Sequence, residues 1–236
     1  MKRTRRWGAV ATAALALGGL TACGGGEAPP ASGTVIAADV SGSAEEASMR
    51  EEAKAAMQAA VEGMEAPETV SMLAFNYKVG TPTCEPLKVT LEWSSSSTSM
   101  KDAKESYIVP AVEAVEPYLD CAKESVEGDG TDVVGAIVES YQMLKDTPGD
   151  KSIVMVSDGC QTYLFELCSP SVSDPAWREQ QLNALADSMK PDMSGVEIEF
   201  VGLARGADMQ STEVQGLRAF YEEFAALTGA SVTFQQ

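Results

Sequence analysis

Short apolar runs alternate with longer segments of helical periodicity through most of the chain. Residues 34–40 form a largely apolar run that predicts a buried strand, and residues 47–65 carry Ala, Met and Val at helical spacing. Further strands are predicted at residues 69–75, 87–93, 152–156, 196–203 and 231–234. Further helices are predicted at residues 101–125, 131–145, 175–189 and 213–227, the first of them broken or kinked at Pro110 and Pro117. This alternation predicts an α/β domain with a mostly parallel sheet and helices on both faces.

The segment 87–93 differs from the other predicted strands because its polar and apolar residues alternate. Leu, Val, Leu and Trp are interleaved with Lys, Thr and Glu, which is typical of a half-exposed strand at a sheet edge. A short connection separates it from the strand at 69–75, so the pair is expected to be antiparallel. The expected fold is therefore Rossmann-like and doubly wound, with six strands of which one is an antiparallel edge strand.

The first 22 residues have the composition of a secretory signal. The basic residues Lys2, Arg3, Arg5 and Arg6 precede an apolar run at 7–20 that is too short for a comfortable membrane span. The sequence Leu20-Thr21-Ala22-Cys23 resembles the lipobox of bacterial lipoproteins. This resemblance implies cleavage before Cys23, attachment of diacylglycerol to that cysteine, and acylation of its new amino group by a fatty acid such as palmitate.

Three segments follow from these observations. Residues 1–22 are expected to be the signal peptide, residues 23–33 the lipidated cysteine and a flexible linker without large apolar residues, and residues 34–236 a single domain. The expected location is the extracytoplasmic face of the bacterial cell membrane, held there by the lipid. A plain signal peptide with an incidental Cys23 is the alternative.

The charge balance limits the class of partner. The chain has 35 acidic and 17 basic residues, for a formal net charge of −18, and loss of the basic leader would leave it more acidic still. Such a domain is a poor candidate for nucleic-acid binding, which needs cations against phosphates. Anionic headgroups would also repel it, so anchoring is expected to depend on the lipid. For most of the surface, the acidity is expected to serve solubility alone.

Four cysteines remain after Cys23: Cys84, Cys121, Cys160 and Cys168. An even number in an exported chain favours two disulfides, although four cysteines allow three pairings. The spacings favour Cys160 with Cys168, which leaves Cys84 with Cys121. A zinc site is the competing possibility, but the chain has no histidine and no Cys-x-x-Cys pair.

Short oxygen-bearing side chains gather at predicted strand ends and helix starts. Asp39, Ser41 and Ser43 follow the first strand, Thr131 opens a later helix, and Asp158 follows the strand at 152–156. Turns from strand to helix lie at the carboxyl edge of an α/β sheet, where ligands usually bind. Oxygen ligands of this kind suit a hard cation such as Mg2+, with Mn2+ or Ca2+ as possible substitutes.

The order and approximate spacing of these residues resemble the metal-ion-dependent adhesion site of von Willebrand factor A domains. The resemblance covers essentially residues 34–236 and rests on Asp39-x-Ser41-x-Ser43, on Thr131 in a Gly-Thr-Asp turn, and on Asp158 in a Ser-Asp-Gly turn. It implies that Ser41 and Ser43 bind the cation directly and that Thr131 does so in the ligand-ready form. Asp39 and Asp158 would act through water or by accepting hydrogen bonds. The cation would then stay electropositive enough to bind an Asp or Glu of a partner protein.

Ordinary local structure could also explain each of these residues separately. Ser43 and Glu46 fit a helix capping box, Thr131 could cap the next helix, and Asp158 with Gly159 could form a simple turn. Capping does not explain why two helices and a distant strand would all bring oxygens to one edge. We therefore expect a metal site.

The segment 160–168 directly follows Asp158 and contains Tyr163 and Phe165 between two cysteines. A disulfide here would order a loop beside the cation, and Tyr163 and Phe165 are candidate partner-binding residues on its rim. The alternative is that these aromatic side chains pack inward and the bond serves stability alone.

The function expected from these features is binding without catalysis: a membrane-anchored domain that uses a divalent cation to engage an acidic residue of a protein partner. A Mg-dependent hydrolase or phosphatase would be a different use of the same ion. However, Ser41 occupies the place of the second Asp of haloacid-dehalogenase phosphatases, and no histidine or Gly-x-Ser-x-Gly elbow is present. The sequence is also compatible with a metal-free extracellular scaffold or a solute-binding lipoprotein.

Overall fold

The computed structural model describes residues 28–41, 46–77, 84–125 and 130–235. Cys23 and Ser43 lie outside the described residues, as does the predicted signal peptide. No helix within the described ranges is long and apolar enough to cross a membrane.

A mixed sheet with the order β3-β2-β1-β4-β5-β6 forms the centre of the domain. The strands are β1 (Ser32–Asp39), β2 (Glu68–Phe75), β3 (Lys88–Leu91), β4 (Lys151–Val156), β5 (Val196–Val201) and β6 (Ser231–Gln235). Only β2 and β3 pair antiparallel within this sheet, and β3 is an edge strand. The predicted six-stranded, doubly wound fold with one antiparallel edge strand is therefore confirmed.

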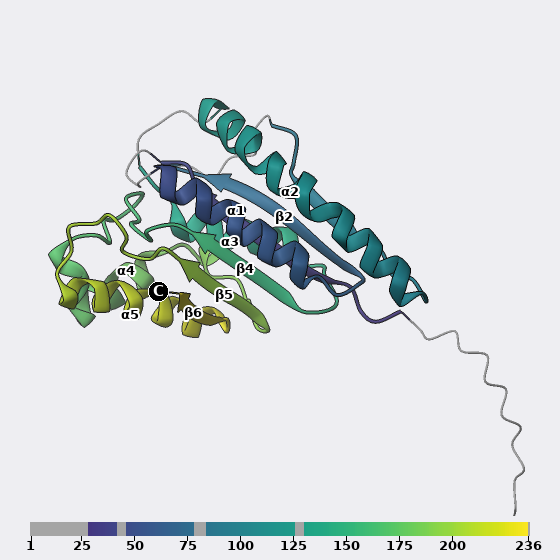
Figure 1. Ribbon diagram of the computed structural model, residues 1–236. Helices are drawn as coiled ribbons and strands as arrows, with labels where there is room; N and C mark the ends of the chain where they lie inside the picture. Colours follow the sequence, from purple (N-terminus) through teal and green to yellow (C-terminus); the bar gives the residue numbers. More distant parts are fainter. Residues whose placement is uncertain (1–27, 42–45, 78–83, 126–129, 236) are drawn as a thin grey trace, which may run out of the picture.

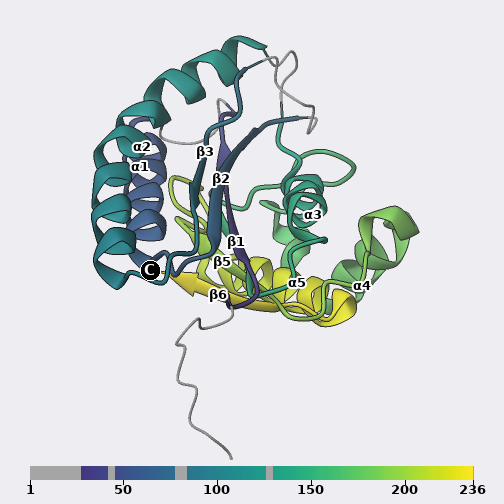
Figure 2. The ribbon, with the colours of Figure 1, turned by 90° about the vertical axis from the view of Figure 1, so that its right-hand side faces the viewer.

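Helices cover both faces of the sheet, as the alternation of elements predicts. α1 (Glu46–Gly63) and α2 (Ser97–Ser125) lie on one face, and α3 (Val133–Leu144) lies on the other (Figures 1 and 2). α4 (Pro175–Ala184) and α5 (Ser211–Thr228) pack on the α3 side, with short 3-10 turns at Pro170–Ser173 and Asp187–Met189. Val35 and Ala37 of β1 point into the α3 side, and Ile36 and Ala38 into the α1–α2 side. β1 is buried on both faces, so its sequence is almost continuously apolar.

The helix expected to be broken or kinked at Pro110 and Pro117 is not broken, because α2 continues through both residues to Ser125. Both prolines are on the outer side of the helix, so the carbonyls that lose a helical partner are on the side open to water. The buried side is held by Tyr118, whose hydroxyl donates to the Met72 carbonyl and accepts from the Ala74 N–H. These two hydrogen bonds engage backbone groups of β2 that lie past the residues paired with β3. They also hold α2 against the sheet.

The helix predicted at 175–189 is shorter than expected. α4 ends at Ala184, and Leu185 adopts an extended conformation that buries its side chain. A 3-10 turn at Asp187–Met189 then follows. α4 therefore ends earlier than its helical sequence pattern predicts, because Leu185 leaves the helix to pack in the core.

Both disulfides have the pairing that the spacings favour. Cys84 is bonded to Cys121, which ties the segment before β3 to α2. Cys160 is bonded to Cys168 and closes the loop that follows β4.

Candidate metal centre

Asp39 ends β1 and is buried by its neighbours across the sheet. β1 lies between β2 and β4, so the segment after Asp39 emerges in the middle of the carboxyl edge. One carboxylate oxygen accepts from the Ser41 N–H at 2.8 Å, and the other accepts from the Ser157 hydroxyl at 2.9 Å. Ser157 in turn accepts from the Gly159 N–H at 3.0 Å. Asp39 therefore fixes both the turn at Ser41 and the turn after β4.

Thr131 lies one residue before the cap of α3 and is fully buried. Its N–H donates to the Thr162 hydroxyl at 2.8 Å, and its carbonyl accepts from the Thr162 and Tyr163 N–H groups. The cap itself is Asp132, whose side chain accepts from the Gly135 N–H. The alternative that Thr131 caps the helix is therefore wrong. The Thr131 hydroxyl instead donates to the Ser41 hydroxyl at 3.0 Å, across 90 residues of sequence.

Asp158 follows β4 and is also buried. One of its carboxylate oxygens accepts from the Cys160 N–H at 2.8 Å, and Gly159 adopts a positive φ of 76°. This is the ordinary Asp-Gly turn that the sequence allows. In this position the Asp158 charge contributes to raising the pKa of Asp39.

The electrostatics of this edge are those of buried, like-charged groups. Burial raises the pKa of Asp39 to about 6, with a smaller contribution from the Asp158 charge. Burial likewise raises the pKa of Asp132 and of Asp158. The pKa of Tyr221 is raised well above its ordinary value by burial and then by the charges of the same three carboxylates. Its hydroxyl donates to the Gly159 carbonyl at 2.7 Å, so the ring lies beneath this cluster.

The structure thus brings Asp39, Ser41, Thr131 and Asp158 to one edge, whereas Ser43 lies outside the described residues. Within residues 28–41, 46–77, 84–125 and 130–235, no three His, Cys, Asp or Glu side chains are grouped to hold a metal ion. Hydroxyls would therefore have to supply part of any direct ligand set, as the sequence pattern predicts. Hard cations accept such neutral and anionic oxygens together.

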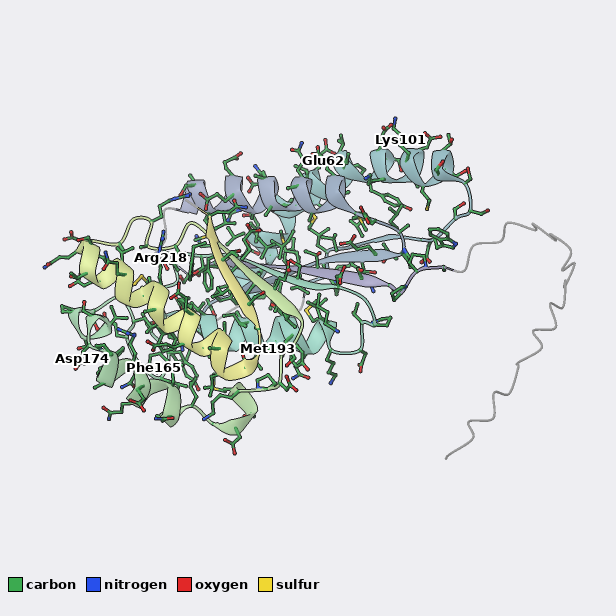
Figure 3. All side chains as sticks on the ribbon, turned by 90° about the horizontal axis from the view of Figure 1, so that it is seen from below. Glu62, Lys101, Phe165, Asp174, Met193 and Arg218 are labelled. Atoms are coloured by element: carbon green, nitrogen blue, oxygen red, sulfur yellow. A yellow bond between two sulfur atoms is a disulfide. The ribbon has the colours of Figure 1, made fainter. Side chains whose placement is uncertain are left out.

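The segment 160–168 divides its aromatic residues between the core and the surface. Phe165 packs against Trp177 of α4 and Phe220 of α5, with ring centroids 6.4 and 5.6 Å away. Figure 3 shows Phe165 on the side of the molecule where α4 and α5 lie. This position favours the alternative of inward packing for Phe165. Tyr163 stays beside Thr131 and meets the ring of Tyr77 edge to face at 5.2 Å.

Sequence reasoning missed two residues of this edge, Tyr77 and Gln161, whereas Leu164 belongs to the segment 160–168 that it places beside the cation. Tyr77 is 39 % exposed, and Leu164 is 60 % exposed with a positive φ of 69°, a conformation that disfavours branched side chains. Gln161 is fully buried, accepts from the Val134 N–H and donates to the Tyr163 carbonyl. No sequence pattern marks Tyr77 or Gln161.

The hollows next to these residues are small. One of about 20 Å³ lies beside Asp39 and Ser41, and one of about 10 Å³ lies beside Ser157 and Asp158. Each has room for about one water molecule. Among the described residues, the buried Asp39 and Asp158 therefore each border a small hollow.

No protein-family model matches the chain, and no curated protein matches it. Among solved structures, it is similar to an aerotolerance-related membrane protein from Bacteroides fragilis, with 16% identity, a TM-score of 0.40, and coverage of 86% of this chain and 91% of that one. It is also similar to a von Willebrand factor type A protein from Catenulispora acidiphila, with 14% identity and a TM-score of 0.40. That match covers 89% of this chain but only 39% of the other. At these TM-scores, the fold assignment rests on the sheet order, which is the Rossmann-like arrangement expected of von Willebrand factor A domains.

Proposed function

We propose that this chain is an adhesion or complex-assembly domain of the von Willebrand factor A type. In this proposal Ser41, Ser43 and Thr131 bind a divalent cation, most simply Mg2+, and Asp39 and Asp158 hold those ligands in place. An Asp or Glu of a protein partner completes the coordination. The lipid on Cys23 anchors the domain at the extracytoplasmic face of the cell membrane, and the domain itself is not an enzyme.

The observation that carries the proposal is the contact between the Thr131 and Ser41 hydroxyls at 3.0 Å. Two oxygens at adjacent corners of a Mg2+ octahedron are about 2.9 Å apart, given metal–oxygen distances of about 2.0–2.1 Å. The two hydroxyls therefore have the separation that such a pair of ligands needs. The capping role of Asp132 adds support, because it frees the Thr131 hydroxyl for this contact.

The buried carboxylates supply the negative charge that a cation needs without filling its coordination positions. Both oxygens of Asp39 already accept hydrogen bonds, from Ser41 and Ser157. Carboxylates held in this way orient the ligating groups and stabilise a nearby positive charge. A cation bound mainly by hydroxyls would act as a Lewis acid toward a partner carboxylate.

The surroundings of the site favour a protein partner over a small substrate. The neighbouring hollows have volumes of about 20 and 10 Å³, too small for a substrate. Exposed Tyr77 and Leu164, together with Tyr163, offer an apolar rim beside Thr131. Tyrosine is enriched where protein partners contact one another.

The test is retention of a partner from detergent-solubilised membranes by the full chain, with Mg2+ and with EDTA. We expect one retained protein that EDTA releases and that the Thr131→Ala variant does not hold. Thr147→Ala is the matched control, because Thr147 lies beyond the other end of α3. An excess of a short Asp-containing peptide should compete with the retained protein.

Retention that is indifferent to EDTA and to Thr131→Ala would exclude a metal-mediated contact. A panel of phosphatase and esterase substrates with Mg2+ tests the non-enzymatic part of the proposal. Turnover that Asp39→Ala abolishes would contradict it.

A further inference from the structure

A groove runs beside α1 on the face of the sheet away from α3, at a distance from the candidate metal centre. Its larger part has a volume of about 630 Å³, and its floor includes Val154 of β4 with Glu199 and Val201 of β5. A second part of about 370 Å³ continues it past Thr34, Glu68 and Ser152, which line both parts. In Figure 1, β5 extends past α1 with no helix in front of it.

The wall of the groove is a stripe of small residues on α1. Ala55, Ala59 and Gly63 are exposed and recur every four residues, so they share one side of the helix. A Cβ added at Gly63 would meet no atom within 4 Å. The opposite side of α1 faces α2, where Arg50 and Lys54 pair with Glu116. α1 therefore packs against α2 on one side. On the other side its small side chains allow a second helix to approach closely.

The dimensions of the groove match a single helix. β5 and β6 lie beyond β4, so the uncovered width is two strand spacings, or about 10 Å, close to the diameter of a helix with its side chains. α1 has 18 residues and is about 27 Å long. A helix of about 12–18 residues would therefore lie along α1 over β5 and β6.

The charge of the groove is strongly negative. Six carboxylates line it: Glu52, Glu68 and Glu199 in the larger part, and Glu65, Asp150 and Glu197 in the smaller part. Lys151 is the only basic residue that lines either part among the described residues. Glu52 pairs with Arg205. For the other five, no Lys or Arg of the described ranges lies within ion-pair distance.

The two carboxylates of β5 are a specific part of this pattern. Glu197 and Glu199 point to the same face as Val201, because alternate residues of a strand share a face, while Val196, Ile198 and Phe200 fill the core on the other side. Two residues along a strand span about 6.8 Å, which is close to the spacing of side chains at i and i+4 of a helix. A helix with Lys or Arg at such positions could pair with both carboxylates.

We propose that this groove is a docking site for a basic amphipathic helix of another polypeptide. Its small apolar residues would lie against Ala55, Ala59 and Gly63, and its Lys or Arg side chains would pair with Glu197 and Glu199. A second copy of this chain is disfavoured because both surfaces would be acidic, with a net charge of −18 per chain. Anionic membrane surfaces are disfavoured for the same reason.

The experiment uses the full chain in detergent and a fluorescein-labelled peptide as the probe. The peptide is an amphipathic helix of about 16 residues with Ala and Leu on one face and Lys at i and i+4 beside it. The comparison peptide carries Glu in place of each Lys. We expect fluorescence anisotropy to show saturable binding of the Lys peptide alone.

Two kinds of variant locate the binding site. Glu197→Lys with Glu199→Lys should weaken binding about tenfold, since both charge pairs become repulsive. Ala59→Trp should weaken binding of the Lys peptide by a similar factor, although it changes no charge. This variant therefore tests whether the peptide occupies the groove or is attracted only by the overall negative charge. The matched control combines Glu92→Lys and Glu113→Lys, two exposed residues away from the groove, and should leave the affinity within about twofold.

Three results would overturn the proposal: no saturable binding of the Lys peptide, an equal loss in the control variant, or unchanged affinity with Ala59→Trp. Dimerisation of the chain that Ala59→Trp abolishes would assign the groove to a second copy and would also overturn it. Circular dichroism shows which variants fold. Binding of Mg2+ does not enter this test, so its outcome is independent of the proposed metal site.

Discussion

Replacing Asp39 with Asn tests whether the buried charge of this residue lowers the stability of the metal-free protein. Asp39 is 3 % exposed and faces the charge of Asp158. The Asn side chain keeps an acceptor for the Ser41 N–H. Its amide group can donate to the Ser157 hydroxyl, which both donates and accepts. The substitution therefore removes the charge and keeps a contact with both partners, with the direction of the Ser157 bond reversed.

The magnitude follows from the pKa of Asp39, which is raised from 3.8 to about 6. Because the folded protein holds this proton more tightly than the unfolded chain, the free energy of unfolding falls as the pH rises between these two values. A shift of this size corresponds to about 3 kcal/mol of lost stability above pH 6. In EDTA at pH 7.5, Asp39→Asn should be more stable than the wild type by up to about this amount.

The assay is urea unfolding followed by circular dichroism in EDTA, at pH 4 and at pH 7.5. We expect wild type and variant to differ little at pH 4, where Asp39 is protonated, and to diverge at pH 7.5. Saturating Mg2+ should reverse the order at pH 7.5, because only the wild type can bind the ion tightly. If Asp39→Asn is no more stable than the wild type in EDTA at pH 7.5, the buried charge does not destabilise this edge and the reasoning is refuted.

Four further predictions concern the scaffold and the residues beside the candidate centre. Tyr118→Phe should lower the free energy of unfolding by about 1–3 kcal/mol, because two backbone groups of β2 lose their hydrogen-bond partner. The control, Tyr107→Phe, changes an exposed residue and should have little effect. Urea unfolding measures both variants. Replacing both cysteines of the 160–168 disulfide with serine should cost about 2–3 kcal/mol by the same measurement, and no loss would show that the ring contributes nothing to stability. Phe165→Ala should destabilise the protein by about 2–4 kcal/mol because the ring packs on α4 and α5. Tyr163→Ala should instead weaken partner retention, and the opposite outcome for the pair would reverse their assigned roles.

The fold could be predicted from the sequence because each of its elements is encoded locally. The apolar run at 34–40 and the alternation at 87–93 give a central and an edge strand, and both appear at those places as β1 and β3. The prolines of α2 do not end the helix, because their cost depends on which side of the helix faces water. That side is decided by tertiary packing around Tyr118, which local sequence does not reveal.

The candidate site could be predicted only as far as its polar residues follow strand ends. Asp39, Ser41 and Asp158 converge because β1 and β4 are adjacent in the sheet. Thr131 is held beside them by its hydrogen bonds with Thr162 in the segment after β4. Which side chain caps α3 could not be predicted, since Thr131 and Asp132 are both good capping residues. Tyr77 comes from a loop far away in sequence, and its contact with Tyr163 exists only in the folded chain.

The most direct test of the central claim is calorimetric titration of Mg2+ into the full chain at pH 7.5. We expect saturable binding at one site in the wild type. We also expect loss of that binding when Ser41 and Thr131 are both replaced by Ala, with Thr147→Ala unchanged. No binding to the wild type, or equal binding to the double variant, would contradict a metal centre built on these hydroxyls.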